Sequence, residues 1–155
     1  MTNLSPADAQ TLRYLVVRMQ RRLRNETQDA SPLNQAEETV LEQLLVAPRQ
    51  TGAELARFQR ITPQSMNVMV KSLLERGYLL AKKNLADKRR KELELTEVGE
   101  RMISSILYRR EAWILERAQE VLDEEEASQL AAALPLLRRL VDREPRPEQD
   151  ESTIE

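Results

Sequence analysis

The chain has 155 residues, 24 Lys and Arg against 26 Asp and Glu, and a formal net charge of −2, which is the size and charge balance of one ordinary folded domain. Its 24 Leu, 3 Gly and 3% aromatic residues favour helices over an all-β fold, because Leu keeps its rotamers in a helix while strands favour β-branched and aromatic residues. Cysteine and histidine are both absent, which excludes disulfides, thiol nucleophiles, Cys/His zinc sites and histidine general bases, so we expect no enzyme, no cofactor and no metal site.

The N-terminal segment MTNLSPADAQ has no apolar signal-peptide core, and nowhere do about 18 apolar residues follow one another, so we expect a cytoplasmic protein without a membrane segment. Ser5 is a favourable N-cap and Pro6 a favourable first helical residue, which predicts a helix from Pro6 to about Asn25. One face of this helix is apolar and the other carries five arginines, which we interpret as a solvated face rather than a membrane or nucleic-acid surface.

Three shorter helices are predicted next, each from its capping pattern. Ser, Thr or Asn followed three residues later by Glu forms a capping box, and Thr-Pro is favourable at a helix start. The predicted starts are Asn34, Thr51 and Thr62, and the corresponding ends lie before Pro48, after Ala56 and at Gly77. Two short helices joined by a tight turn, the second of them stopped by glycine, form the layout of a helix-turn-helix.

Two strands are predicted directly after this motif, from Tyr78 to Lys83 and from Lys91 to Leu95, with the basic loop NLADKRR between them. They form a β-hairpin of the kind called a wing. Thr96 then caps a long helix, and Asp123 with Glu126 caps the last one, both with Leu and Ile at helical spacing.

The nearly neutral total hides a local excess of positive charge. Ten basic residues and two acids lie between Arg57 and Lys91, which gives this segment a charge of +8. Such a segment can bind a polyanion on one face of the protein, although an isolated charge run is more often a solvated, salt-bridged surface.

The stretch TGAELARFQRITPQSMNVMVKSLLERGYLLAKKNLADKRRKELELTEVGERM resembles the MarR family of bacterial transcriptional regulators. The most specific part is DKRRKELELTEVG, and the similarity spans roughly Leu33 to Met102. The resemblance implies a mainly α fold with a small β-hairpin wing, in which a winged helix-turn-helix domain is joined to a helical dimerisation region. It also implies a homodimer that binds a pseudo-palindromic site on double-stranded DNA and acts as a repressor.

These expectations divide the chain by function. The winged helix-turn-helix domain is expected over residues 33–96, the dimerisation region over 1–32 and 97–142, and a disordered acidic tail over 143–155.

Two alternative functions remain at this point. A winged helix can serve as a protein-interaction module without DNA binding, and an enzyme could use a carboxylate pair, although no acid pair lies on an apolar, Gly-rich or pocket-like segment.

The helical period separates two faces of the predicted recognition helix. The apolar face is Met66, Met69, Val70, Leu73 and Leu74, and the exposed face is Gln64, Ser65, Asn67, Val68 and Lys71. Gln and Asn can bind adenine edges, Lys suits guanine or phosphate, and Val68, where many members of the family carry Arg or Lys, can contact a thymine methyl. Thr62 at the N-cap leaves helix N–H groups available to a phosphate.

In the wing, the resemblance implies that Asp87 orients an arginine while Arg89 enters the minor groove. Lys88 and Arg90 are candidates for phosphate contacts, and for Arg90 a simple surface charge is an equal alternative.

The resemblance also makes a small aromatic anion a candidate effector, because relatives often bind such ligands between the dimerisation helices and the winged domain. The alternative is a repressor that has no effector. Tyr14, Arg18, Met19 and Tyr108 are candidate ligand contacts, although aromatic residues at helical spacing among Ile and Leu are more often part of a core.

Overall fold

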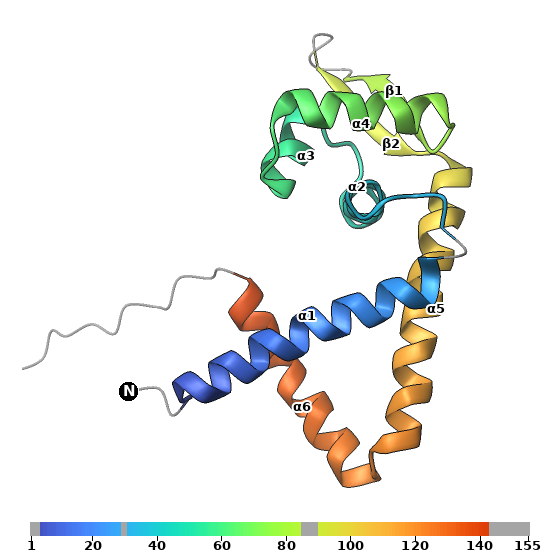
Figure 1. Cartoon of the computed structure of the whole chain (residues 1–155). Helices are drawn as coiled ribbons and strands as arrows, with labels where there is room; N and C mark the ends of the chain where they lie inside the picture. Colours follow the sequence, from blue (N-terminus) through green and yellow to red (C-terminus); the bar gives the residue numbers. More distant parts are fainter. Residues whose placement is uncertain (1–3, 29–30, 85–89, 143–155) are drawn as a thin grey trace, which may run out of the picture. The chain divides into compact units, whose positions relative to one another are not determined.

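The computed structural model describes residues 4–28, 31–84 and 90–142. In chain order the elements are α1 (Pro6–Gln28), α2 (Gln35–Val46), α3 (Gly52–Gln59), α4 (Pro63–Glu75), β1 (Leu79–Lys83), β2 (Lys91–Leu95), α5 (Glu97–Val121) and α6 (Glu124–Val141). The predicted fold class, mainly α with a two-stranded hairpin, is confirmed (Figure 1). The chain forms two compact units, residues 1–113 and 114–155, which are divided within α5.

The predicted capping residues begin the helices as expected. Asn34, Thr51 and Asp123 each accept a hydrogen bond from the backbone N–H three residues later, and the Glu at that position bonds back to the cap. These reciprocal bonds satisfy backbone donors that a helix start otherwise leaves unpaired. Helix α1 extends three residues beyond the predicted end at Asn25, and Thr27 in this last turn is buried with its hydroxyl bonded to Leu23 O and Arg24 O.

Glycine ends α4, the helix predicted to be the recognition helix. Gly77 has φ +76°, a left-handed conformation that glycine adopts without steric penalty, and Tyr78 N–H donates to Leu73 O at 2.9 Å. This bond closes the C-terminal turn of α4 and directs the chain into β1.

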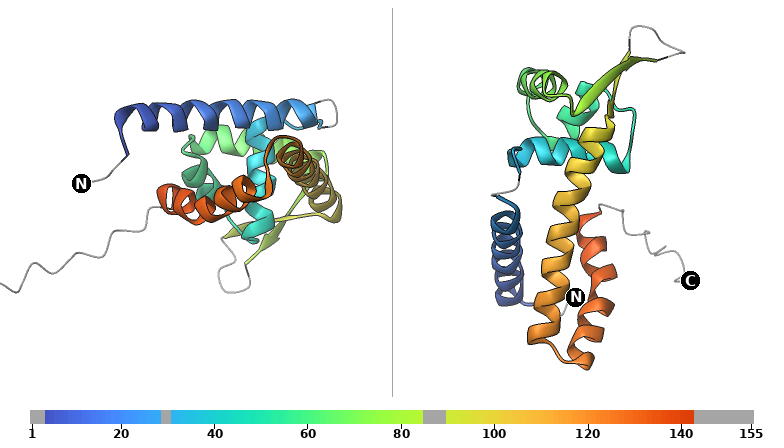
Figure 2. Two further views of the ribbon diagram at one scale, coloured as in Figure 1. Left: turned by 90° about the horizontal axis from the view of Figure 1, so that it is seen from below. Right: turned by 90° about the vertical axis from the view of Figure 1, so that its right-hand side faces the viewer.

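The hairpin is antiparallel, with Leu79 paired to Leu95 and Lys83 to Lys91. It begins one residue later than predicted because Tyr78 belongs to the turn that ends α4. Leu93 is also joined to Gln50 by an isolated bridge, and β1 contacts α4 while β2 contacts α2 and α3. The hairpin is therefore packed against the helix-turn-helix, as Figure 2 shows from two further sides.

One apolar core holds the winged part of the first unit together. It takes residues from the segment just before α2, from α2, α3 and α4, from both strands and from the first turns of α5. Its buried members are Leu33, Val40, Leu41, Leu44, Leu55, Ala56, Met66, Leu73, Leu79, Leu93, Ile103 and Ile106. This core fixes α4 on its apolar side and leaves the opposite side free.

The second unit contains the end of α5 and the whole of α6. Helix α6 has no buried residue in the single chain, although it carries large apolar side chains along its length.

Within the described residues, no helix is both long and apolar enough to span a membrane.

Candidate nucleic-acid interface

Helix α4 presents one polar, exposed face. Met66 and Leu73 are fully buried, and Met69, Val70 and Leu74 pack partly buried against the same core. The side chains on the other face are exposed, and Val68 is 73% exposed. The separation predicted from the helical period is therefore confirmed. The exposed residues are Gln64, Ser65, Asn67, Val68 and Lys71.

Thr62 begins this helix as predicted. Its hydroxyl accepts a hydrogen bond from Ser65 N–H at 3.2 Å and lies 2.9 Å from the Ser65 hydroxyl. Pro63 follows at the first helical position, where its missing N–H leaves no donor unpaired. Thr62 and Ser65 thus stand together, exposed, at the N-terminal end of the polar face.

Several cations of the basic segment are paired within the protein. Arg76 bonds Glu37 at 2.8 Å, Lys82 bonds Glu94 at 2.6 Å, and Arg90 pairs with Glu54. Lys71 lies 3.8 Å from Glu75, a long contact between two exposed side chains that contributes little. Among the described residues of this segment, exposed cations without a hydrogen bond or ion pair are Arg57, Arg60, Lys83 and Lys91.

Arg90 holds the hairpin against α3. Its guanidinium pairs with Glu54, the capping-box residue of α3, and lies 3.9 Å from Glu92 on β2. Hydrogen bonds from the Thr51 backbone and hydroxyl, and then the contact with Arg90, lower the pKa of Glu54. The sequence shows Glu54 as a cap but gives no sign of this partner, which lies 36 residues away. The other predicted wing contacts, Asp87, Lys88 and Arg89, lie outside the described residues.

The predicted ligand contacts do not gather in one hollow. The Arg18 guanidinium lies 5.5 Å from the centre of the Tyr14 ring, which brings these two together on α1. Met19 is about half exposed, and Tyr108 on α5 is 72% exposed.

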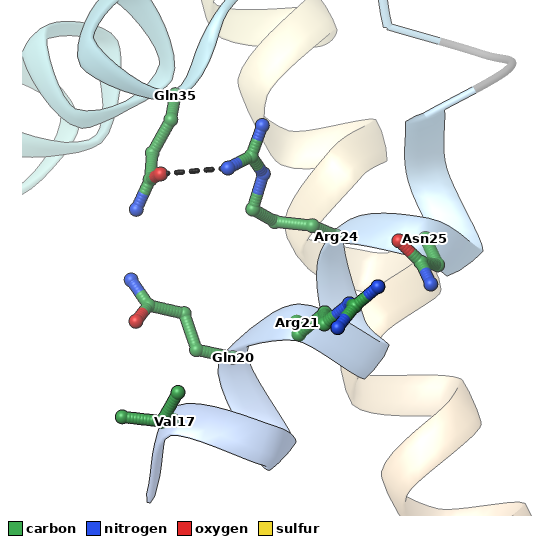
Figure 3. A pocket seen from close by; sticks show the side chains of 6 residues that line it. All are labelled: Val17, Gln20, Arg21, Arg24, Asn25 and Gln35. Carbon is green, nitrogen blue, oxygen red and sulfur yellow. Dashed lines mark hydrogen bonds between the residues drawn. The ribbon is translucent and has the colours of Figure 1, made fainter.

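Two neighbouring hollows lie beside the C-terminal half of α1 instead. The larger, about 400 Å³, is lined by Val17, Gln20, Arg21, Arg24, Asn25 and Gln35 (Figure 3). The smaller, about 150 Å³, is lined by Arg24, Ser31, Leu33, Gln35, Glu38 and Arg110. Arg24 and Gln35 line both hollows and are joined by a hydrogen bond of 2.8 Å. The ligand contacts predicted from the sequence, between the dimerisation helices and the winged domain, do not include the residues that line these hollows.

A buried polar junction forms one wall of the smaller hollow. Arg110 on α5 donates to Glu38 on α2 at 2.6 Å and to the buried Thr27 hydroxyl on α1 at 3.0 Å. Ser31 donates to the second oxygen of Glu38 at 3.0 Å. The junction ties α1, α2 and α5 together inside the first unit, and every charge in it has a partner.

No group of three or more carboxylates within the described residues is arranged to hold a metal ion.

Comparison with known proteins finds transcriptional regulators with the same fold. No family model matches the chain. The chain is 30% identical to a proposed transcriptional regulator from Pseudomonas aeruginosa whose crystal structure superposes with a TM-score of 0.80, over 93% of this chain and 100% of that one. A MarR family protein from Bacillus stearothermophilus is 20% identical, with a TM-score of 0.79 over 91% and 98% of the two chains.

An HTH-type transcriptional regulator of Mycobacterium tuberculosis is 28% identical over 137 residues, which cover 88% of this chain and 94% of the relative. The helix-turn-helix, the hairpin beside it and the long helices agree with these similarities, and the chain belongs to the MarR family of winged helix-turn-helix transcriptional regulators.

Proposed function

We propose that the protein is a homodimeric repressor that binds a pseudo-palindromic site on double-stranded DNA. The observation that carries the proposal is the exposed polar and cationic face of α4, opposite an apolar face that packs against the core. A helix fixed in this way can enter the major groove without disturbing the core.

The exposed residues of α4 have the chemistry to read base edges. Gln64 and Asn67 can pair with adenine, Lys71 with guanine or a phosphate, and the Val68 methyls with thymine. Ser65 is adaptable, and Thr62 places the helix N-terminus beside a phosphate.

The wing supplies the second group of contacts in this proposal. Arg89 enters the minor groove, Asp87 orients an arginine, and Lys88 binds a phosphate. Arg90 has a separate role, because its pairing with Glu54 favours anchoring of the hairpin over a phosphate contact.

A second copy of the chain is the proposed partner of the terminal helices, which correspond to residues 1–32 and 97–142. Exposed apolar side chains lie on α1 and α6, and leaving this apolar surface in water is unfavourable. They include Tyr14, Leu15, Val16 and Met19 on α1, and Leu130, Leu134, Leu136, Leu137 and Leu140 on α6. Two-fold symmetry then places two recognition helices about 34–36 Å apart, one turn of DNA.

We infer that a small aromatic anion releases the protein from DNA. The hollows beside Arg24 support this, because they combine arginines with amide groups and adjoin the junction that ties α1 and α5 to α2. Tyr14, Arg18, Met19 and Tyr108 remain candidates for contacts with the ring.

The test is capture of genomic fragments by the purified protein, followed by sequencing and by binding measurements on the enriched sites. We expect enrichment of a few sites, each containing two inverted half-sites one helical turn apart. Transcription from an adjoining promoter should fall when the protein is added. A protein that enriches no sequence, or that activates the promoter it binds, contradicts this proposal.

A further inference from the structure

The turn between α3 and α4 contains an arginine in a conformation that suits glycine. Arg60 has φ +55° and ψ +40°, the left-handed region, and it caps the C-terminal end of α3. The turn itself requires this conformation, since Arg60 N–H donates to Arg57 O at 3.2 Å and Ile61 N–H to Ala56 O at 3.1 Å. Glycine adopts the same conformation without steric penalty because it has no Cβ. The backbone conformation therefore does not explain why an arginine stands at this position.

The other left-handed positions among the described residues have clear explanations. One is Gly77, and the second is Arg49, whose Nε donates to Glu94 at 2.8 Å. The Arg49 side chain thus compensates its backbone conformation with an ion pair. The Arg60 side chain is exposed, and its guanidinium makes no hydrogen bond or ion pair with any residue that the structure describes.

The charge around Arg60 is not neutralised nearby in the chain. Residues 55–74 contain no acid and three basic residues, Arg57, Arg60 and Lys71. The acids at the two ends of this stretch are engaged, since Glu54 bonds Thr51 and Arg90, and Glu75 faces Lys71. Arg60 lies two residues before Thr62, which begins the helix that carries the proposed base contacts.

We propose that Arg60 binds a backbone phosphate of the DNA next to the recognition helix. This rests on the proposed function and adds to it a contact that is not among the DNA-binding residues named from the sequence. The strained backbone is retained because the guanidinium acts on a partner outside the protein, where Arg is well suited to phosphate. The competing explanation is purely structural: a cation at the C-terminal end of α3 is favourable to the helix dipole.

The two explanations predict opposite effects of Arg60→Gly on stability. If Arg60 serves DNA, the glycine variant should be more stable, with a Tm about 2–4 °C higher for a chain of this size. The same variant should bind DNA about tenfold or more weakly, as expected for loss of a charge-assisted bond. If Arg60 serves α3, the Tm should fall.

Salt titration identifies the lost contact as a phosphate. Log K should depend less steeply on log salt by about 0.9 for each phosphate, or about 1.8 for a dimer with two such arginines. A mixed-sequence duplex is the probe, because a phosphate contact does not depend on sequence, and an enriched genomic site is measured in parallel. Arg60→Lys should keep most of the salt dependence without the gain in Tm.

Arg49→Gly is the matched control, because it relieves the same backbone conformation but breaks the bond to Glu94. Its salt dependence should equal that of the wild type. Wild-type affinity and salt dependence in Arg60→Gly, or a lowered Tm, would overturn the phosphate contact while leaving the proposed function intact. Failure of the wild-type protein to bind either duplex would overturn both.

Discussion

Gly99, near the start of α5, is required by a close approach of two backbone segments. A Cβ at this position would lie 2.1 Å from the carbonyl oxygen of Tyr78. That carbonyl cannot move easily, because it accepts bonds from the Thr96 N–H at 3.0 Å and hydroxyl at 3.2 Å. The Thr96 hydroxyl also accepts from Gly99 N–H, so the junction from α4 to β1 is clamped to the start of α5.

We therefore expect Gly99→Ala to destabilise the protein by about 3 kcal/mol or more, at the upper end of the cost of overpacking. Gly52→Ala is the control, because its Cβ would meet only the Asn67 side-chain oxygen at 3.7 Å. Thermal denaturation should show a lower Tm for the first variant and little change for the second. Equal Tm values for the two variants would contradict this account of the junction.

Two glutamates of the winged part make stability depend on acid. Bonds from Thr51 lower the pKa of Glu54, and bonds from Lys82 and then Arg49 lower the pKa of Glu94. The folded state therefore binds protons at these two carboxyl groups less tightly than the unfolded state does. The stabilisation that the ionised carboxylates give is complete above the ordinary pKa of 4.5 and is lost as the pH falls below that value. The Tm should therefore fall on acidification, and it should fall less in Glu54→Gln.

At the scale of single elements, local signals predicted the helix starts and the hairpin, whereas side-chain partners far apart in sequence were not predictable. Capping boxes at Asn34, Thr51 and Asp123 involve residues three apart, and their pattern is visible in any window of the chain. The contact of Arg110 with Glu38 spans 72 residues and has no local pattern. The left-handed Arg60 was equally hidden, because the usual indicator of that conformation is glycine.

The recognition helix offers two substitutions with different expected results. Asn67→Ala should relax preference at one base position, at a cost of about 1–3 kcal/mol for the preferred site. If Lys71 reads a guanine, Lys71→Ala should relax the preference at that base position. If Lys71 binds a phosphate, the variant should bind all sequences more weakly by the same factor, and the slope of log K against log salt should fall by about 0.9 per contact. Binding to a panel of single-base operator variants separates these outcomes.

Arg101→Ala on α5 is the control for both variants, since it removes an exposed cation that pairs with Glu97 four residues away. Operator preference and salt dependence should stay unchanged in this protein. If Asn67→Ala retains the full wild-type preference at every position, the assignment of α4 as the reading helix is wrong.

At the scale of the whole molecule, the exposed apolar residues of the terminal helices predict self-association. Leu134 and Leu140 are exposed in the single chain, so Glu at either position should leave the fold of that chain intact. In a dimer that buries them, each substitution acts twice and should raise the dissociation constant by about 100-fold or more. Sedimentation should show a dimer for the wild type and for the control Val46→Glu, but monomer for Leu140→Glu. A wild-type monomer at micromolar concentration would contradict the proposed dimer.

The composition also limits how a regulator of this kind can be switched. Thiol oxidation requires cysteine, protein zinc sites draw mainly on His and Cys, and titration near neutral pH is a property of histidine. The chain has neither residue. For the effector proposed above this leaves an organic ligand, and the arginines that line the two hollows, Arg21, Arg24 and Arg110, would favour an anionic one. An aromatic carboxylate such as salicylate should therefore release the protein from its operator, whereas micromolar peroxide or zinc should not. The affinity for DNA should change little between about pH 6 and 8.

Arg24→Ala should weaken the response to the ligand more than the affinity for DNA, with Arg13→Ala as a control from the same helix. Release by peroxide or zinc, or an identical ligand response in the two variants, would contradict this mechanism.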